Sequence, residues 1–320
     1  MARRQNYLSS QQVDLINGNI QPIPFENLFD IFLDDCDLRN LRPDTQRYYR
    51  NELQAFKKVL TEQNIDPTPN NITKSIIQKN FIQYSIKQGL KTSSINTRLR
   101  AIRAFFNYLY KYEHIELNPV SELQLLSNRR EVVETFSKTQ INHLLKQVNF
   151  KTFTGVRDYT IMLLLLETGI RANECVNLNV DDIRWEDSMI VIRHTKNHRQ
   201  RLVPFTAKMR KSLDRWLALR GVVETRRIFI TVDDTPLSRR QLYTRLRQYG
   251  ELAKINNVRV SAHTFRHTFA KYCVEQGASI FDLQKLLGHS SMEMVRTYVN
   301  MFSTEVRDNH RSFSPLRFID

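Results

Sequence analysis

Six polar side chains in the second half of the chain are of types suited to chemistry on a phosphodiester. They are Arg171, Lys196, His263, Arg266, His289 and Tyr298. A guanidinium group can bind both free oxygens of a phosphate, so the two arginines could hold a phosphodiester between them. A tyrosine hydroxyl can attack phosphorus and form a covalent intermediate. The set therefore predicts a nucleic-acid substrate and a reaction that breaks its backbone.

The charge of the chain agrees with a polyanionic substrate. The sequence holds 48 Lys and Arg against 33 Asp and Glu, a formal net charge of +15. Residues 136–320 carry 30 basic and 18 acidic side chains, whereas residues 1–135 carry 18 and 15. The surplus thus lies in the half that holds the six polar residues, which favours nucleic-acid binding over a merely basic protein.

Charge is also segregated within the first half. No acidic residue lies between Asp66 and Glu113, where eight Lys and Arg occur. A solvated helix face usually mixes both signs, so this stretch predicts a surface that follows phosphates. The candidate DNA contacts are Lys91, Arg98, Arg100 and Arg103 here, and Arg239, Arg240 and Arg245 in a helix expected from Ser238. For this second group, a solvated basic helix is the alternative.

Three cysteines, Cys36, Cys175 and Cys273, lie too far apart for a disulfide framework or a zinc motif. The longest apolar run, residues 161–166, is far shorter than the roughly 20 residues that span a bilayer. The first residues lack the apolar stretch of a signal peptide. We therefore expect a cytoplasmic protein that does not enter a membrane.

A zinc site deserves separate consideration, because His263 and His267 stand four residues apart as in a zinc-binding helix. The residues between them include no glutamate base, and Arg266 would repel a cation. We expect no metal and no other cofactor.

Hydrophobic periodicity predicts a mainly helical chain with a small antiparallel sheet, an α+β fold. In the first half it indicates helices over residues 25–36, 43–62, 73–87 and 92–112. In the second half, helices surround two strands, residues 189–192 and 201–204, joined by a polar turn. Pro119 and a polar run predict a linker at 117–135 between a helical DNA-binding domain, 1–116, and a second domain, 136–320.

Several segments, in this order, resemble the tyrosine recombinase (phage integrase) family. They are TGIRANE at 168–174, Thr195-Lys196, RLVP at 201–204, HTFRHTFA at 263–270, LGH at 287–289 and Tyr298. No one of them is specific, but together in this order they are. The basic helical half resembles, more loosely, the SAM-like core-binding domain of that family. The resemblance implies a helical core-binding domain followed by a catalytic domain.

The resemblance also implies a role for each polar residue. Arg171 and Arg266 would clamp the scissile phosphate, and Tyr298 would attack it to form a 3′-phosphotyrosyl bond. Lys196, on a mobile hairpin, would protonate the leaving 5′-oxygen, with Arg199 as a nearby rival. The remaining roles are proton transfer near the nucleophile for His263, phosphate binding for His289 and orientation of the arginine for Glu174. Each histidine taken alone could equally be structural, and we interpret His267 as structural.

The family function is site-specific recombination of double-stranded DNA through a Holliday junction, by four protomers on two DNA sites. Because the phosphotyrosyl bond preserves the energy of the broken bond, neither ATP nor a metal is required. The alternatives are a type IB topoisomerase-like enzyme and a DNA-binding protein without chemistry.

Several points stay open after the resemblance. The target sequence is one, and the need for accessory proteins is another. The role could be that of an integrase, a transposon or integron recombinase, a dimer resolvase or an inversion enzyme. A tail at about 301–320 is expected to dock on a neighbouring protomer, or else on its own domain.

Overall fold

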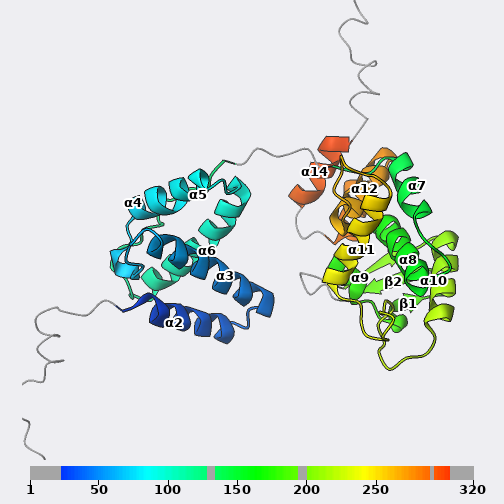
Figure 1. Cartoon of the computed structure of the whole chain (residues 1–320), viewed down its shortest axis with the longest axis horizontal. Coiled ribbons are helices and arrows are strands. Elements are labelled where there is room, and N and C mark those ends of the chain that lie inside the picture. The colour runs from blue at the N-terminus through cyan, green and yellow to red at the C-terminus, as the bar shows by residue number, and fades with distance from the viewer. Residues whose placement is uncertain (1–22, 128–133, 194–199, 289–291, 303–320) are drawn as a thin grey trace, which may run out of the picture. The chain divides into compact units, whose positions relative to one another are not determined.

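The computed structural model describes residues 23–127, 134–193, 200–288 and 292–302. The chain divides into two compact units, residues 1–131 and 132–320, shown in Figure 1. Helices dominate both units, and the described strands form one three-stranded antiparallel sheet. The mainly helical fold with a small antiparallel sheet, predicted from the sequence, is confirmed. No helix in the described part of the chain has the length and apolar character to cross a membrane.

The first unit is built from helices packed through aromatic side chains. They are α2 (Phe25–Leu38), α3 (Pro43–Thr61), α4 (Lys74–Ile76), α5 (Tyr84–Lys87) and α6 (Thr92–Lys111), with a 3₁₀ turn η1 (Pro69–Asn71). A π-helical segment, η2 (Ile77–Gln83), joins α4 to α5. The single helix predicted over 73–87 is therefore continuous but more loosely wound in its middle.

The core of the first unit extends into the predicted linker. Val120 and Leu123 are buried against its helices. The Asn96 side chain donates to the Leu126 carbonyl at 2.8 Å and accepts from the Leu126 amide at 2.9 Å. Residues 117–126 thus belong to the first unit, because apolar side chains of this segment pack on its core although the segment forms no helix of its own. Phe136 is already buried in the second unit, and residues 128–133 lie outside the described chain.

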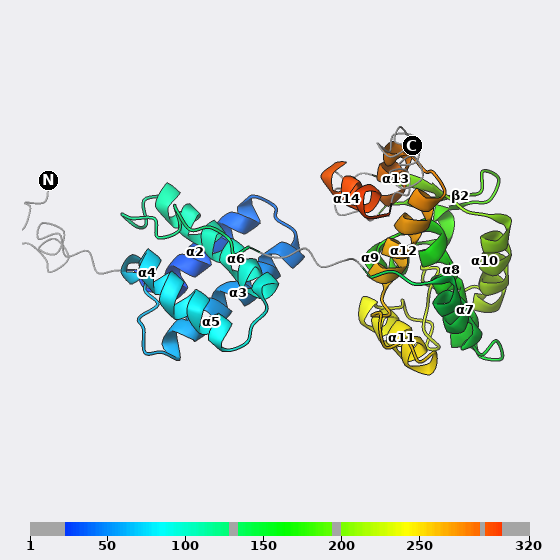
Figure 2. The same ribbon diagram turned by 90° about the horizontal axis from the view of Figure 1, so that it is seen from above.

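The second unit surrounds a central apolar helix, α8 (Phe153–Thr168), which lies between α10 and α12 in both Figures 1 and 2. Its other helices are α7 (Lys138–Lys146), α9 (Ala172–Val176), α10 (Ala207–Arg220), α11 (Arg239–Leu252), α12 (Ala262–Glu275), α13 (Ile280–Leu287) and α14 (Met292–Phe302), with a 3₁₀ turn η3 (Val180–Asp182). Most residues of α8 are buried, so its apolar character on all sides reflects contacts on all sides.

The sheet contains the two predicted strands and one more. Strand β2 (Met189–Ile192) pairs with β3 (Arg201–Pro204), and Ile190 lies opposite Val203. The additional strand, β1 (Ile183–Arg184), pairs with the other edge of β2. Two residues are too few to show an alternating pattern in a sequence, which is why β1 was not predicted.

A small separate core fixes the last helix. Val295 and Tyr298 of α14 are buried with Phe269 and Ala270 of α12 and Leu287 of α13. Val295 and Tyr298 are three residues apart and share one face of α14. This packing brings the late tyrosine against α12, which carries His263 and Arg266.

Candidate active site

Gly169 shapes the turn that presents Arg171. Helix α8 ends at Thr168, and Gly169 follows with φ of 59°, in the left-handed region. A Cβ at this position would lie 2.4 Å from the Phe269 ring, so glycine alone fits both the backbone and the space. The Gly169 carbonyl accepts a hydrogen bond of 2.7 Å from Arg266 Nη1. The TGIR segment thus ties the start of α9 to α12.

Three arginines converge on the C-terminal end of α13. Arg201 Nε donates to the Leu286 carbonyl and Arg266 Nη2 to the Leu287 carbonyl, each at 2.8 Å. Arg171 donates weakly to Leu287 at 3.5 Å and to Gly288 at 3.4 Å. The last carbonyls of a helix lack partners within the helix and carry partial negative charge. The three arginines therefore fix the C-terminal end of α13, which directly precedes His289 in the sequence.

Glu174 joins two of these arginines. Its carboxylate accepts from Arg171 Nη1 at 2.9 Å and from the Arg171 amide at 2.8 Å. It also accepts from Arg201 Nη1 at 3.0 Å and Arg201 Nη2 at 2.8 Å. Burial alone would raise the pKa of Glu174, but the bonds and charges of Arg201 and Arg171 outweigh it and lower the pKa. A permanently ionised Glu174 fixes the direction of the Arg171 side chain.

Arg266 is almost fully buried, with 6% of its surface exposed. Burial, and to a smaller extent the charge of Arg171, lowers its pKa to about 10. The guanidinium still carries its charge at neutral pH. A buried cation beside a second arginine strongly favours an anion between them, and a phosphodiester supplies one.

Tyr298 lies against these cations, with 6% of its surface exposed. Its Oη is 2.8 Å from His267 Nδ1. Burial raises the pKa of the Tyr298 phenol, although the hydrogen bond and charge of Arg266 and the charge of Arg171 oppose this. The hydroxyl is therefore protonated at neutral pH in the protein without DNA.

The histidine beside the tyrosine is not the one that the sequence favoured. His263 lies one helical turn before His267 on α12 and reaches the surface. Partial burial and the charges of Arg266, Arg171 and Arg259 lower the pKa of His263. His267, interpreted from the sequence as structural, instead forms the hydrogen bond to Tyr298. The sequence feature that could have indicated this role of His267 is its position next to Arg266 and four residues after His263.

Two of the six polar residues cannot be located. Lys196 falls within 194–199 and His289 within 289–291, both outside the described residues, as does Arg199. Their flanks are placed: β2 ends at Ile192 and β3 begins at Arg201, while Gly288 ends α13. The structure thus brings together Arg171, Glu174, His263, Arg266 and Tyr298.

The comparisons with known proteins agree with this geometry. The Phage integrase family model matches residues 134–305, and the model of the Phage integrase N-terminal SAM-like domain matches residues 32–113. The chain belongs to the phage integrase family. Tyrosine recombinases of this family are DNA breaking-rejoining enzymes, and the resemblance in the sequence is confirmed together with this enzyme class.

Individual tyrosine recombinases resemble most of the chain. Tyrosine recombinase XerC of Oceanobacillus iheyensis is 28% identical over 284 residues, which cover 87% of this chain and 92% of that protein. The structure of XerH bound to palindromic difH substrate in a post-cleavage complex has a TM-score of 0.72 at 19% identity, covering 87% of this chain and 82% of that one. A lambda integrase tetramer bound to a Holliday junction also gives 0.72, at 17% identity over 89% and 81% of the two chains. At these identities the structural likeness concerns the fold.

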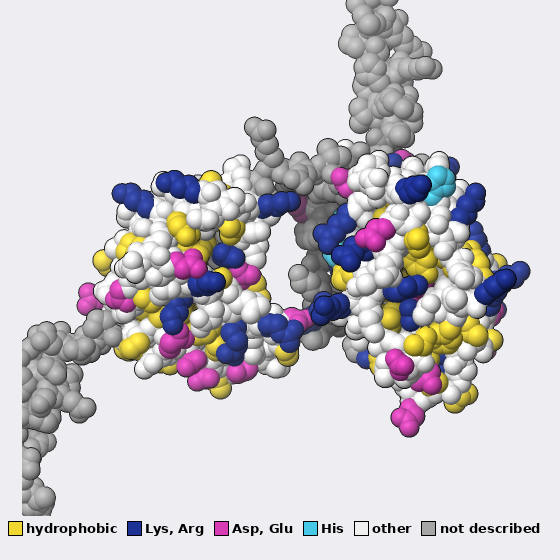
Figure 3. All heavy atoms as spheres, in the orientation of Figure 1, with side chains coloured by type: hydrophobic (Ala, Val, Ile, Leu, Met, Phe, Trp, Pro, Cys, Tyr) yellow, Lys and Arg dark blue, Asp and Glu magenta, His cyan; other side chains and the backbone are white. Residues whose placement is uncertain are grey.

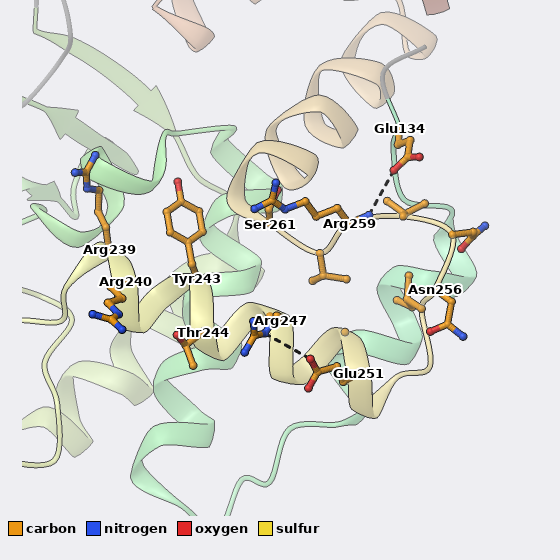
Figure 4. Close-up of a pocket in the computed structure, with 15 residues that line it drawn as sticks. Glu134, Arg239, Arg240, Tyr243, Thr244, Arg247, Glu251, Asn256, Arg259 and Ser261 are labelled. Carbon is orange, nitrogen blue, oxygen red and sulfur yellow. Dashed lines mark hydrogen bonds and ion pairs between the residues drawn. The ribbon is translucent and has the colours of Figure 1, made fainter. Parts of the chain in front are cut away.

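A basic groove in this recombinase lies between α11 and the loop that follows it, as Figure 4 shows. It has a volume of about 980 Å³, and Arg239, Arg240 and Tyr243 line it from α11. The loop contributes Arg259, which the sequence did not single out. Arg239 and Arg240 are exposed and form no ion pair within the described chain. They have the setting expected of DNA contacts.

Arg245 differs from its neighbours on α11, because it has a buried partner. Its Nε donates to Asp158 at 2.6 Å and its Nη2 to Tyr249 at 3.1 Å. Asp158, 4% exposed, also binds the buried Arg157 at 2.8 Å. The half-buried Arg245 therefore connects α11 to α8 through Asp158. The sequence shows the basic helix but not which of its arginines meets a buried carboxylate.

The candidate contacts of the first unit lie on or just before α6. Lys91 and Arg100 are exposed, whereas Arg103 is half-buried and Arg98 is 3.3 Å from Glu52. Figure 3 shows Lys and Arg side chains over the visible face of both units. In the first unit, Asp and Glu side chains gather at the lower edge, over α2. Lys91 and Arg100 are the better placed for phosphates.

Proposed function

We propose that this chain is a site-specific DNA recombinase that cleaves and rejoins double-stranded DNA through a covalent tyrosine intermediate. Tyr298 attacks the scissile phosphorus, so that an Oη–P bond forms and the P–O5′ bond breaks. Lys196 gives a proton to the leaving 5′-oxygen, and the phenolic proton leaves Tyr298. A 5′-hydroxyl of a partner strand then reverses these steps and joins a new strand.

The convergence of Arg171 and Arg266 beside Tyr298 is the observation that carries this proposal. Both donate to the Leu287 carbonyl, and the charge and hydrogen bond of Arg266 act to lower the pKa of the tyrosine hydroxyl. Two guanidinium groups supply the charge that stabilises a pentacoordinate phosphorane, which in many other enzymes comes from metal ions. A tyrosine far from such a pair would have nothing to stabilise the transition state.

The other site residues take supporting roles in this proposal. Glu174 orients Arg171, and His263, one turn before His267 on α12, takes part in proton transfer. His289, which follows α13 in the sequence, binds the phosphate. Arg239, Arg240 and Arg259 on one unit, and Lys91 and Arg100 on the other, contact the DNA.

We propose further that four protomers act on two specific DNA sites, passing through a Holliday junction. The likeness to the lambda integrase tetramer on a Holliday junction supports this. The likeness to XerC of Oceanobacillus iheyensis supports a reaction in the cytoplasm.

The proposed docking of the tail concerns residues 303–320, outside the described chain, whereas Phe302 packs on its own unit. Removing residues 303–320 should impair assembly on two sites but leave Tyr298 in place.

Covalent capture tests the chemistry and finds the target. The protein is incubated with nicked duplexes that carry a randomised segment, and DNA that stays attached after denaturation is sequenced. Wild-type protein should enrich one sequence, while Tyr298→Phe should bind DNA and capture none. Tyr159→Phe, which removes a tyrosine hydroxyl on α8 without touching the site, is the matched control. Covalent adducts formed by Tyr298→Phe would remove Tyr298 from the role of nucleophile.

The same reagents separate recombination from simple strand relaxation. Two plasmids bearing the enriched sequence should exchange strands, and plasmids without it should stay supercoiled. Relaxation of any plasmid, without exchange between two sites, would assign a type IB topoisomerase-like activity instead.

A further inference from the structure

Among the described residues, two polar neighbours of the Tyr298 hydroxyl have opposite character. Arg266, one residue before His267 on α12, forms a hydrogen bond to it. His267 Nδ1 lies 2.8 Å away on the same helix, and the His267 and Tyr298 rings are 5.5 Å apart at 46°. The tyrosine hydroxyl is therefore held by consecutive residues of α12.

The chemistry of the two neighbours fixes the direction of each hydrogen bond. A guanidinium group has only donors, so Oη accepts the bond from Arg266. The phenol keeps its own hydrogen, because its pKa is raised. Of these two partners, only the imidazole nitrogen can accept that hydrogen. In the neutral tautomer with its proton on Nε2, His267 directs its Nδ1 lone pair at the Tyr298 hydroxyl.

We propose that His267 is a positioning residue for the nucleophile: by accepting the phenolic hydrogen through Nδ1, it sets the direction in which Oη presents its lone pairs to the phosphate. The proposal rests on the proposed role of Tyr298 as nucleophile. It assigns a function to a residue whose sequence context suggested only packing.

Positioning, rather than removal of the proton, is what this pair can do. Burial, with smaller contributions from His263 and Arg266, lowers the pKa of His267 to about 4. The phenol pKa is raised above its usual value near 10. An imidazole that weak does not hold the phenolic proton, but it does restrict the O–H rotor. A misplacement of a reacting atom by about 1 Å can cost up to about a hundredfold in rate.

The surroundings make the pair rigid enough for such a role. Tyr298 and Val295 are buried in the small core with Phe269, Ala270 and Leu287, so α14 is fixed on α12. His267 itself is half-buried and lies on the same face as His263, one turn away. Neither ring can swing aside without disturbing this core.

Three substitutions of His267 separate its nitrogen from its volume. His267→Phe keeps a ring against Tyr298 but removes the acceptor. In His267→Asn, the amide oxygen stands two bonds from Cβ, as Nδ1 does, so the acceptor is retained. His267→Gln carries the same amide one methylene further out. Single-turnover cleavage of the enriched nicked duplex is measured for each full-length protein, with DNA affinity measured in parallel.

We expect His267→Phe and His267→Gln to cleave about tenfold to a hundredfold more slowly than wild type with unchanged affinity, while His267→Asn stays within about threefold. A purely structural role predicts that the three variants follow their unfolding midpoints instead. Cleavage by His267→Phe at the wild-type rate, while Tyr298→Phe is inert, would overturn this inference alone. Adduct formation by Tyr298→Phe would instead overturn the proposed nucleophile.

Discussion

Arg201 and Glu174 form a two-point ion pair, with Nη1–Oε1 at 3.0 Å and Nη2–Oε2 at 2.8 Å. Arg201 opens β3, directly after the hairpin that carries Lys196, and Glu174 orients Arg171. Arg201 Nε also donates a hydrogen bond to the Leu286 carbonyl in the last turn of α13. One side chain therefore links the hairpin, the arginine clamp and the approach to His289.

Replacing Arg201 should destabilise the catalytic unit and abolish cleavage. Arg201→Met leaves the Glu174 carboxylate, 2% exposed, without its main partner, at a cost of about 3 kcal/mol in the free energy of unfolding. Arg201→Lys keeps the charge but loses the two-point geometry, and should fall between wild type and Arg201→Met. Urea unfolding followed by tryptophan fluorescence measures this unit, because both tryptophans, Trp185 and Trp216, lie in it.

Arg226→Met is the matched control for Arg201→Met. Arg226 pairs with Asp181 at 3.0 Å, but its side chain is 81% exposed, so the loss should be below about 1 kcal/mol. Equal losses in the two variants would show that the buried pair contributes nothing beyond a surface pair.

Gly169→Ala should cost more than an ordinary glycine substitution. The new methyl group would meet the Phe269 ring at 2.4 Å and stand at a positive φ, so we expect a loss of about 3 kcal/mol and slow cleavage. Gly277→Ala, at φ of 81° with open space around it, bears only the backbone cost of about 1 kcal/mol. The unfolding midpoints of the two variants test the difference, and a Gly277→Ala loss as large as that of Gly169→Ala would contradict it.

Arg240 and Arg245 should respond differently to removal, although both stand on α11. Arg240→Ala should weaken DNA binding several-fold and lower the salt dependence of binding by about one charge, with stability unchanged. Arg245→Ala should lower stability by about 2 kcal/mol, because Asp158 is 4% exposed. Binding isotherms at several salt concentrations and urea unfolding separate the two effects. If the salt dependence of DNA binding changes in Arg245→Ala but not in Arg240→Ala, then Arg245 is the DNA contact, as the sequence predicted.

His267 should make the catalytic unit less stable as the pH falls. The unfolded chain binds a proton on this residue below about pH 6.5, whereas the folded chain does so only below about pH 4. Between these values the unfolded state holds more protons, so stability falls from pH 6.5 towards pH 4 and then levels off. The shift corresponds to at most about 3 kcal/mol. In His267→Phe this part of the fall in stability should be absent. If the free energy of unfolding falls equally in wild type and variant from pH 7 to pH 4, His267 does not contribute to the fall.

Local signals made much of the architecture predictable. The stripes of α2, α3 and α6 and the apolar run of α8 depend on each segment's own spacing. Strand β2 is a short apolar run, and a polar segment of the sequence separates it from β3. In contrast, the segment of Val120 and Leu123 forms no helix or strand of its own although it joins the core of the first unit, and β1 is too short to show a period. Such features depend on contacts with other elements and not on a segment's own pattern.

The sequence by itself determined the chemistry, because residue type decides what a side chain can do. Two arginines, a late tyrosine and a basic surplus specify cleavage of a phosphodiester in nucleic acid. Tertiary structure decided which neighbours each side chain meets, since contacts join residues that are up to 136 positions apart. It placed His267, rather than His263, at 2.8 Å from the Tyr298 hydroxyl, and it turned Arg245 inward to Asp158.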